Sequence, residues 1–151
     1  MIRQGKGPIV GSGENRRSMA YVDNLCQGLL LAALTPVAAG RAYWIADRLP
    51  YTMNQVIDTV ERLLETEFGL SVAHKRLRLP GLAAEVAYAC DWALQSLGRY
   101  HQKIHVLSEM NKHIACSVAL AERELDYRPA VALEEGMRRS IRWCLEQGLA
   151  I

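Results

Sequence analysis

The residues best suited to chemistry follow a glycine-rich stretch that runs from Gly5 to Gly13. Asn15, Arg16 and Arg17 come directly after it. A planar guanidinium can hold phosphate oxygens through two parallel hydrogen bonds, so Arg17 is a candidate anion-binding residue. A solvated loop arginine is the competing interpretation, and for Arg16 a plain surface charge is favoured. The glycines favour tight backbone turns and close approach of other groups.

The histidines and cysteines do not follow a metal or redox motif. Three histidines lie between residues 101 and 113 without the helical His-Glu-x-x-His spacing of a zinc site. The cysteines are widely scattered, without a Cys-x-x-Cys pair: Cys26, Cys90, Cys116 and Cys144. We therefore expect buried thiols in a reducing cytoplasm, and no metal ligands.

Composition narrows the class of protein further. The chain has 151 residues, half of them hydrophobic, and a formal net charge of +2, which indicates one globular domain and gives no support to nucleic-acid binding. The basic run from Lys75 to Arg78 is typical of a solvated strand edge. The longest apolar run, Leu29–Leu34, is far shorter than the roughly 20 residues of a membrane span. The first residues lack the apolar core of a signal peptide, so we expect a cytoplasmic protein without membrane contact.

Short extended segments and helices alternate in the first half. Pro8–Val10 and Ser18–Val22 are predicted to be extended, and Asp23 is placed to cap a helix that runs from Asn24 to about Leu34. A second extended segment, Ala42–Ala46, is rich in aromatic residues.

The second half is predicted to be mainly helical. A helix begins near Thr52, and its apolar stripe is Val56, Ile57, Val60, Leu63 and Leu64. A third helix follows Pro80-Gly81 and ends at Gly98, with a candidate core face of Leu82, Val86, Ala89, Cys90, Ala93, Leu94 and Leu97. Ser117 caps a short helix over 118–125, and the last helix has the apolar face Leu133, Met137, Ile141, Cys144 and Leu145. The stretch 99–113 has no clear period. Strands that arrive singly between helices indicate one end of an α/β fold.

Two stretches resemble one protein family. Gly11-Ser12-Gly13-Glu14-Asn15-Arg16-Arg17, followed by Val22-Asp23-Asn24-Leu25, resembles the "G-x-G-x-x-x-R … V-x-D-L" segment of extended short-chain dehydrogenases/reductases. Glu122-Arg123-Glu124-Leu125-Asp126-Tyr127-Arg128-Pro129, followed by Leu133-Glu134-Glu135-Gly136, is similar to their late "E-L-G-Y-x-P … L-E-E-G" signature. Between the two, Tyr43-Trp44-Ile45-Ala46 stands where the family has a "Y-N-I-G" strand.

The resemblance covers nearly the whole chain and implies a fold and a class of reaction. Residues 1–151 would form the helix-rich, C-terminal substrate-binding portion of a Rossmann-type NAD(P)-dependent epimerase/dehydratase, with two or three short strands. The complete enzyme would bind NAD or NADP, transfer hydride from a substrate hydroxyl such as that of a sugar nucleotide, and possess a surface for homodimer formation. This chain alone would bind neither cofactor.

Two family elements are missing from the sequence. Arg16 stands where the third glycine of a dinucleotide turn belongs, and no tyrosine is followed four residues later by lysine. We therefore expect no catalytic residues here, and an N-terminal dinucleotide-binding half outside the chain. Met1 would correspond to an internal methionine of a longer protein or to a mis-called start. The alternatives are a truncated, non-catalytic ligand-binding or interaction module, or a fragment of a 3β-hydroxysteroid dehydrogenase-like enzyme.

The resemblance also nominates substrate-binding residues. Arg17 matches the arginine that contacts the substrate diphosphate in sugar-nucleotide enzymes, and Asn15 matches a position near the nucleotide. Gly13 would serve backbone geometry and close approach, while Lys103 and Lys112 are candidates for a second phosphate contact. Asn24 departs from the family, which has an acidic residue there. A sterol or another apolar alcohol remains an alternative substrate.

Overall fold

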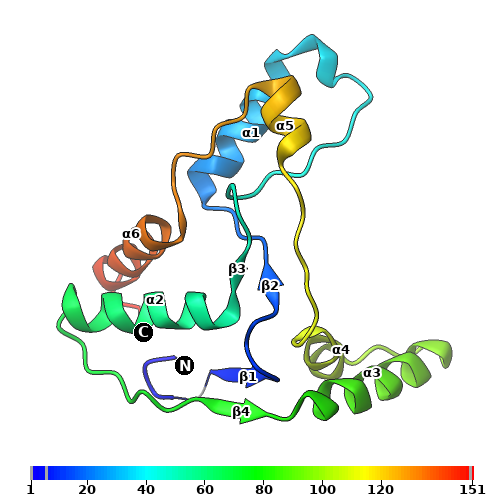
Figure 1. The fold of residues 1–151 in the computed structure, drawn as a ribbon, viewed down its shortest axis with the longest axis vertical. Helices are drawn as coiled ribbons and strands as arrows, with labels where there is room; N and C mark the ends of the chain where they lie inside the picture. The colour runs from blue at the N-terminus through cyan, green and yellow to red at the C-terminus, as the bar shows by residue number, and fades with distance from the viewer. Residues whose placement is uncertain (1, 6, 150) are drawn as a thin grey trace.

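The computed structural model describes residues 2–5, 7–149 and 151, so Met1 lies outside the described part. The described residues form six α-helices, one 3-10 helix and four short strands (Figure 1). In chain order they are β1 (Pro8–Val10), β2 (Arg16–Arg17), α1 (Val22–Leu34), the 3-10 helix (Pro36–Ala38), β3 (Tyr51–Thr52), α2 (Met53–Thr66), β4 (Leu77–Leu79), α3 (Gly81–Ser96), α4 (Gln102–Glu109), α5 (Ala119–Leu125) and α6 (Leu133–Glu146). The helix-rich α/β class predicted from the sequence is confirmed.

The strands form two separate pairs. β1 lies parallel to β4, with Ile9 opposite Arg78, and β2 lies antiparallel to β3, with Arg16 opposite Thr52. The prediction of a strand over Ser18–Val22 is wrong in its bounds, because the paired residues end at Arg17 and Val22 already belongs to α1. Residues 42–46 are extended as predicted but pair with no strand in the described residues.

The start of α1 also differs from the prediction. Tyr21 is the N-cap residue, with extended φ and ψ angles, and Asp23 lies inside the first turn. Asp47 accepts a 3.4 Å bond from the Tyr21 amide, and this contact holds the backbone extended up to that residue. Asp23 instead pairs with Arg139 of α6 at 3.1 Å. A carboxylate in the first turn still interacts favourably with the helix dipole.

Helix α2 forms as its sequence predicts. The Thr52 hydroxyl accepts from the Gln55 amide at 3.1 Å, and the Gln55 side chain accepts from the Thr52 amide at 2.8 Å, which completes a capping box. The predicted apolar stripe is buried throughout. Part of that stripe packs on α6 in one core cluster: Val60, Leu63, Leu64 and Ile141.

A second core joins α1, α5 and the extended segment 42–46. Its buried members are Ala46, Val118, Ala121, Leu125 and Tyr127. Helix α5 begins at Ala119, one residue later than predicted, and the Ser117 hydroxyl accepts from the Ala119 amide at 3.3 Å. Figure 1 shows α1 and α5 together at one end of the molecule, with α3 and α4 at the other.

Helices α3 and α4 form a hairpin that overturns two predictions. The expected core face of α3 points to solvent, where Leu82 is 72% and Leu97 is 76% exposed. The cysteines are free but not buried: Cys26 and Cys90 are exposed because they lie on the outer sides of α1 and α3, and the other two are half-buried.

Of the helices in the described ranges, none has the length and apolar character that crossing a bilayer demands.

Candidate functional site

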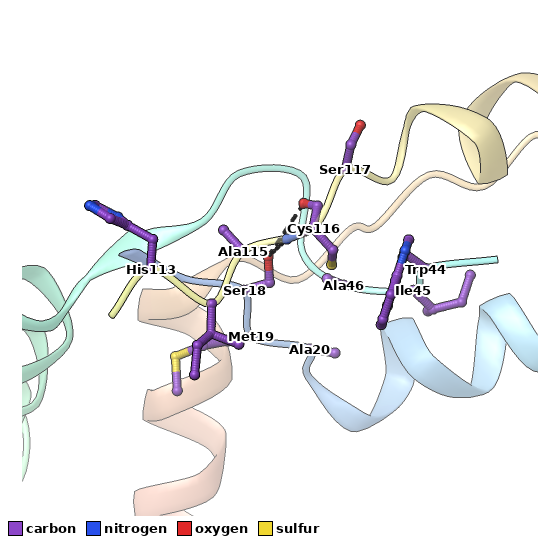
Figure 2. A pocket seen from close by; sticks show the side chains of 11 residues that line it. Ser18, Met19, Ala20, Trp44, Ile45, Ala46, His113, Ala115, Cys116 and Ser117 are labelled. Atoms are coloured by element: carbon purple, nitrogen blue, oxygen red, sulfur yellow. Dashed lines mark hydrogen bonds between the residues drawn. The ribbon is translucent and has the colours of Figure 1, made fainter. Parts of the chain in front are cut away.

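An open groove lies where three extended segments meet, namely residues 18–20, 44–46 and 113–117 (Figure 2). Its volume is about 720 Å³. Figure 2 shows His113 at one end and Trp44 at the other, with Met19 between them. Most of the lining is apolar, and the polar groups are hydroxyl, thiol and imidazole side chains. The groove therefore suits an apolar body with few hydrogen-bonding groups.

Backbone bonds hold the three segments beside one another. The Ile114 amide donates to the Arg16 carbonyl at 2.8 Å, and the Ser18 amide donates to the Ile114 carbonyl at 3.0 Å. The Ser18 hydroxyl accepts from the Cys116 amide at 3.0 Å and donates to the Cys116 carbonyl at 3.4 Å, as the dashed lines in Figure 2 indicate. On the other side, the Asp47 amide donates to the Met19 carbonyl at 2.7 Å.

A buried polar network fixes the segment that carries Trp44. Asn24, which is 2% exposed, donates to Asp47 at 2.8 Å and to the Val131 carbonyl at 2.6 Å. The Val131 amide donates back to Asn24 at 3.1 Å. The Tyr127 hydroxyl donates to the Ala46 carbonyl at 2.9 Å, and burial raises the pKa of Tyr127 to about 12. The phenol is therefore a neutral structural donor and not a proton-transfer group at ordinary pH.

The predicted residues Asn15 and Arg17 meet the chain that follows α4. Asn15 is buried and donates to the Met110 carbonyl at 2.9 Å. Arg17 is half-buried and donates to the Glu109 carbonyl at 3.0 Å, at the end of α4. Among the described residues, no carboxylate lies within ion-pair distance of Arg17. A guanidinium has five donors, so this contact leaves most of its donor capacity for another acceptor.

Lys112 and Lys103 occupy different places. Lys112 follows α4 close to the Arg17 contact, and its ammonium lies 3.9 Å from the centre of the Tyr88 ring. Lys103 is exposed in the first turn of α4 and lines a second groove of about 510 Å³ with Leu79 and Val106. The structure thus brings Asn15, Arg17 and Lys112 to one end of α4 and leaves Lys103 at the other.

None of the five nominated residues lines the groove of Figure 2, although their chain neighbours Ser18 and His113 do. In an extended chain successive side chains point to opposite sides, so Arg17 and Ser18 serve different faces. The sequence predicts extended structure for two of the three segments and shows no clear period before the third, so it does not predict that they form a groove. The aromatic content of residues 42–46 was the one signal for this site.

The glycine-rich turn does not fit a dinucleotide. It follows β1, as such a turn should, but it leads into β2 and not into a helix. Gly13 has φ +80°, and an added Cβ would overlap the side-chain amide of Asn54. The space beside Gly13 is therefore filled by the protein itself. No pyrophosphate cradle is formed here.

A second polar cluster joins α3 to α4. The imidazole of His105 lies 2.8 Å from Asp91, which is buried, and Gln95 donates to the same carboxylate oxygen at 2.8 Å. The hydrogen bond to Asp91 raises the pKa of His105 above its usual value. The negative charges of Asp91 and Glu109 raise this pKa further, while desolvation and the positive charge of Lys112 lower it by less. The other Asp91 oxygen is buried without a hydrogen-bond partner in the described residues.

Comparison with solved structures defines the fold as that of the C-terminal portion of Rossmann-type extended short-chain dehydrogenases/reductases. An epimerase of Methanothermobacter thermautotrophicus aligns with 97% of this chain at a TM-score of 0.66 and 20% identity, and 34% of that protein is covered. The UDP-glucuronic acid 4-epimerase of Bacillus cereus, solved with NAD, aligns with 93% of the chain (TM-score 0.59, 18% identity, 34% of that protein). The UDP-glucose 4-epimerase of Thermotoga maritima, solved with UDP-glucose, aligns with 97% (TM-score 0.60, 20% identity, 37% of that protein).

Curated relatives point to the same enzyme group. An uncharacterised protein of Sinorhizobium fredii is 53% identical over 98% of the chain, which spans 42% of that protein. The 3β-hydroxysteroid-dehydrogenase/decarboxylase isoform 1 of Arabidopsis thaliana is 31% identical over 92% of the chain, with 34% of its own length covered. The 2-alkyl-3-oxoalkanoate reductase of Stenotrophomonas maltophilia is also 31% identical, over 91% of the chain and 42% of its length. No family model matches the chain. The characterised relatives and structural neighbours include epimerases, reductases, steroid dehydrogenases/decarboxylases and a dehydratase, some of them solved with NAD, and this chain spans less than half of their length.

Proposed function

We propose that this chain is the substrate-binding portion of an NAD(P)-dependent oxidoreductase of the epimerase/dehydratase type. The observation that carries the proposal is the alignment of nearly the whole chain with about one third of two epimerases, one of which was solved with NAD. The dinucleotide would be bound by a separate half of the enzyme, since the glycine-rich turn of this chain fits none. The contribution of this portion is to bind and orient the substrate.

Two exposed surfaces support the existence of such a partner half. Residues 42–46 are extended, and their amide groups have no backbone partner in the described part of the chain. Next to them, α1 exposes four leucines to solvent: Leu25, Leu29, Leu30 and Leu34. Unpaired backbone amides beside an apolar helix face form a surface that a strand and the sheet behind it could pair with and cover. We assign this end of the molecule to contact with the nucleotide-binding half.

Arg17 is our candidate for the substrate's anionic end, and a sugar nucleotide is the substrate class that it suits. The guanidinium is half-buried, has no carboxylate partner among the described residues and is oriented by the Glu109 carbonyl. A phosphate group would find an oriented donor there with most of its hydrogen-bonding capacity unused. Asn15 supports the arrangement by tying the same strand to Met110.

Titration calorimetry of the purified chain tests this role. We expect micromolar binding of UDP-glucose, a loss of about 10- to 100-fold in Arg17→Ala, and no heat with NAD. Arg16→Ala is the matched control, since Arg16 is exposed and, within the described residues, its backbone amide donates to His113 while its guanidinium makes no hydrogen bond or ion pair. Circular dichroism of Arg17→Ala would verify that α4 remains folded. Unchanged affinity in Arg17→Ala would exclude Arg17 as the phosphate contact. No binding of UDP-glucose by the wild-type chain would mean that the pocket needs the nucleotide-binding half.

The groove of Figure 2 favours a second candidate, an apolar alcohol such as a 3β-hydroxysteroid. Its lining is mainly apolar, and Trp44 is 70% exposed at one end. The 31% identity to an Arabidopsis 3β-hydroxysteroid-dehydrogenase/decarboxylase supports the same idea. A steroid in the groove would quench the fluorescence of Trp44, and Trp44→Phe would abolish that change while the other two tryptophans keep their signal. Quenching that UDP-glucose does not reverse would favour this candidate over the first.

A further inference from the structure

The imidazole of His113, at one end of the groove in Figure 2, is held in a single tautomer. Its Nδ1 atom accepts a hydrogen bond from the backbone amide of Arg16 at 3.1 Å. A ring nitrogen that accepts a hydrogen bond carries no proton, so the neutral imidazole bears its hydrogen on Nε2. The side chain is exposed, and within the described residues Nε2 has no partner. His113 therefore presents an N–H donor at this end of the groove.

The backbone fixes the orientation of this donor. Arg17 pairs with Ile114 in a parallel bridge, and the Ile114 amide donates to the Arg16 carbonyl at 2.8 Å. The amide of Arg16 faces the same neighbouring segment, and His113 supplies its acceptor where the pairing begins. The ring cannot rotate without breaking this bond at the start of the pairing. The Nε2 hydrogen is therefore positioned before any ligand arrives.

The side chain of Arg16 lies on the same face of these paired segments as that of His113. Side chains alternate along an extended chain, and residues opposite each other share a face. Arg17 lies opposite Ile114, so Arg16 and His113 are the neighbouring pair on the other face. Asn15 and Arg17 both contact the end of α4, as expected for residues that share the first face. Within the described residues, the Arg16 guanidinium makes no hydrogen bond or ion pair, so a cation stands unpaired beside the imidazole.

The rest of the groove is apolar and carries no opposing charge. Among the described residues, no carboxylate lines it. The Ser18 hydroxyl is already bonded to the backbone of Cys116, so it has little capacity left for a ligand. Trp44 forms the opposite end. An anionic group would therefore be attracted to the end that holds His113 and Arg16, while an apolar body would lie along the remaining lining.

We propose that the groove binds an apolar carboxylic acid, with its carboxylate at Arg16 and His113 and its apolar body extending toward Trp44. The guanidinium and the Nε2–H group would donate charge-assisted hydrogen bonds to the carboxylate oxygens. The inference rests on the second candidate function above, in which the groove accepts an apolar body, and adds the polar group that orients this body. It is independent of the sugar-nucleotide candidate, because Arg17 lies on the opposite face.

Decanoate and decanol, which have equally long chains and differ in the polar group, test the proposal at neutral pH. The readout is the fluorescence of Trp44, and Trp44→Phe gives the signal of the other two tryptophans. We expect the full chain to bind decanoate about 10-fold more tightly than decanol, or better. Equal affinities would overturn the proposal and leave the apolar groove as a site for neutral molecules. Binding of neither molecule would refute this proposal together with the second candidate function.

Variants at the two ends of the groove locate the carboxylate. His113→Asn keeps an acceptor for the Arg16 amide, because the asparagine Oδ1 can replace Nδ1, but it removes the Nε2 donor. We expect His113→Asn and Arg16→Ala each to weaken decanoate binding about 10-fold without affecting decanol, and Arg16→Lys to retain most of the affinity.

Arg48→Ala is the matched control, since Arg48 is an exposed cation that follows the segment containing Trp44, and it should leave both affinities unchanged. Circular dichroism should show that all variants are folded. A loss of decanoate binding in Arg48→Ala would place the carboxylate at the Trp44 end. An equal loss of decanoate and decanol binding in His113→Asn would show that the ring is merely structural. Either result would overturn the proposal.

Discussion

Replacing Asn24 with aspartate should destabilise the protein strongly at neutral pH. The side-chain amide of Asn24 donates at the same time to Asp47 and to the Val131 carbonyl, at 2.8 and 2.6 Å. In Asn24→Asp, an oxygen replaces this donor group and faces two acceptor oxygens in a site from which water is excluded. Extended short-chain dehydrogenases/reductases, which this chain resembles, have an acidic residue at this position. The variant therefore tests whether the hydrogen bonds of this chain require an amide where the family has a carboxyl group.

The magnitude follows from the cost of keeping the new carboxyl protonated. An unfolded aspartate has a pKa of about 3.9, so holding it neutral at pH 7 costs about 4 kcal/mol, and a protonated carboxyl still replaces only one of the two bonds, which adds about 1 kcal/mol. We therefore expect a loss of about 5 kcal/mol in the free energy of unfolding. The pKa of the new carboxyl is raised in the folded state, so the deficit is largest at high pH and shrinks toward about 2–3 kcal/mol at pH 5.

Urea unfolding followed by circular dichroism at both pH values measures this effect as the difference between variant and wild type. Asp23→Asn is the control, because Asp23 is exposed and its pair with Arg139 is worth less than about 1 kcal/mol. A deficit in Asn24→Asp below about 1 kcal/mol, or one independent of pH, would show that the Asn24 network is not rigid enough to discriminate amide from carboxyl.

Two further predictions concern the hairpin and the glycine turn. The pKa of His105 is raised chiefly by its hydrogen bond to Asp91. This pair should therefore stabilise the α3–α4 hairpin fully below about pH 6.5, and the stabilisation should be lost as pH rises through the folded-state pKa. A nuclear magnetic resonance titration should show the raised pKa, and His105→Gln should remove the part of the pH dependence of the thermal midpoint that comes from this pair. Gly13→Ala should lower the free energy of unfolding by about 2–3 kcal/mol, because its φ is positive and the new Cβ displaces Asn54. Gly40→Ala should lower it by about 1 kcal/mol, because Gly40 has φ +71° but open space around it. Equal losses of unfolding free energy in chemical denaturation of the two variants would contradict the packing argument.

The sequence predicted structure correctly where neighbouring residues alone determine it, as in helix α2. The α2 helix starts at the predicted position beside Thr52, where the structure adds a capping box with Gln55, and its predicted stripe of branched apolar residues is buried. Asp23 had the right residue type for a cap, but the Asp47 carboxylate, distant in sequence, fixes the helix start at Tyr21. Propensity at one position cannot reveal such a contact.

The misreading of α3 has a different cause. Its apolar periodicity correctly predicted a helix, but the prediction assumed that the apolar face must be the buried one. The actual inner face depends on small alanines and on the Asp91–His105 pair, whose members are separated by 14 residues in the sequence. The contact of Arg17 with Glu109 crosses 92 residues. Neither of these pairings has a local signature, and for the groove between three distant segments only the aromatic content of residues 42–46 gave one.

The bonds between Asn24 and Val131 link positions that are 107 residues apart, and this has a consequence for how the protein is made. On a ribosome that adds about 5–20 residues per second, roughly 5–20 seconds pass between the synthesis of α1 and the synthesis of its last hydrogen-bond partners. During that interval Leu31 and Ala32 of α1, which pack against this core in the folded chain, and the side-chain amide of Asn24 lack their native contacts. The nascent chain thus offers a binding site for chaperones until the segment before α6 emerges and closes the α1–α5 core.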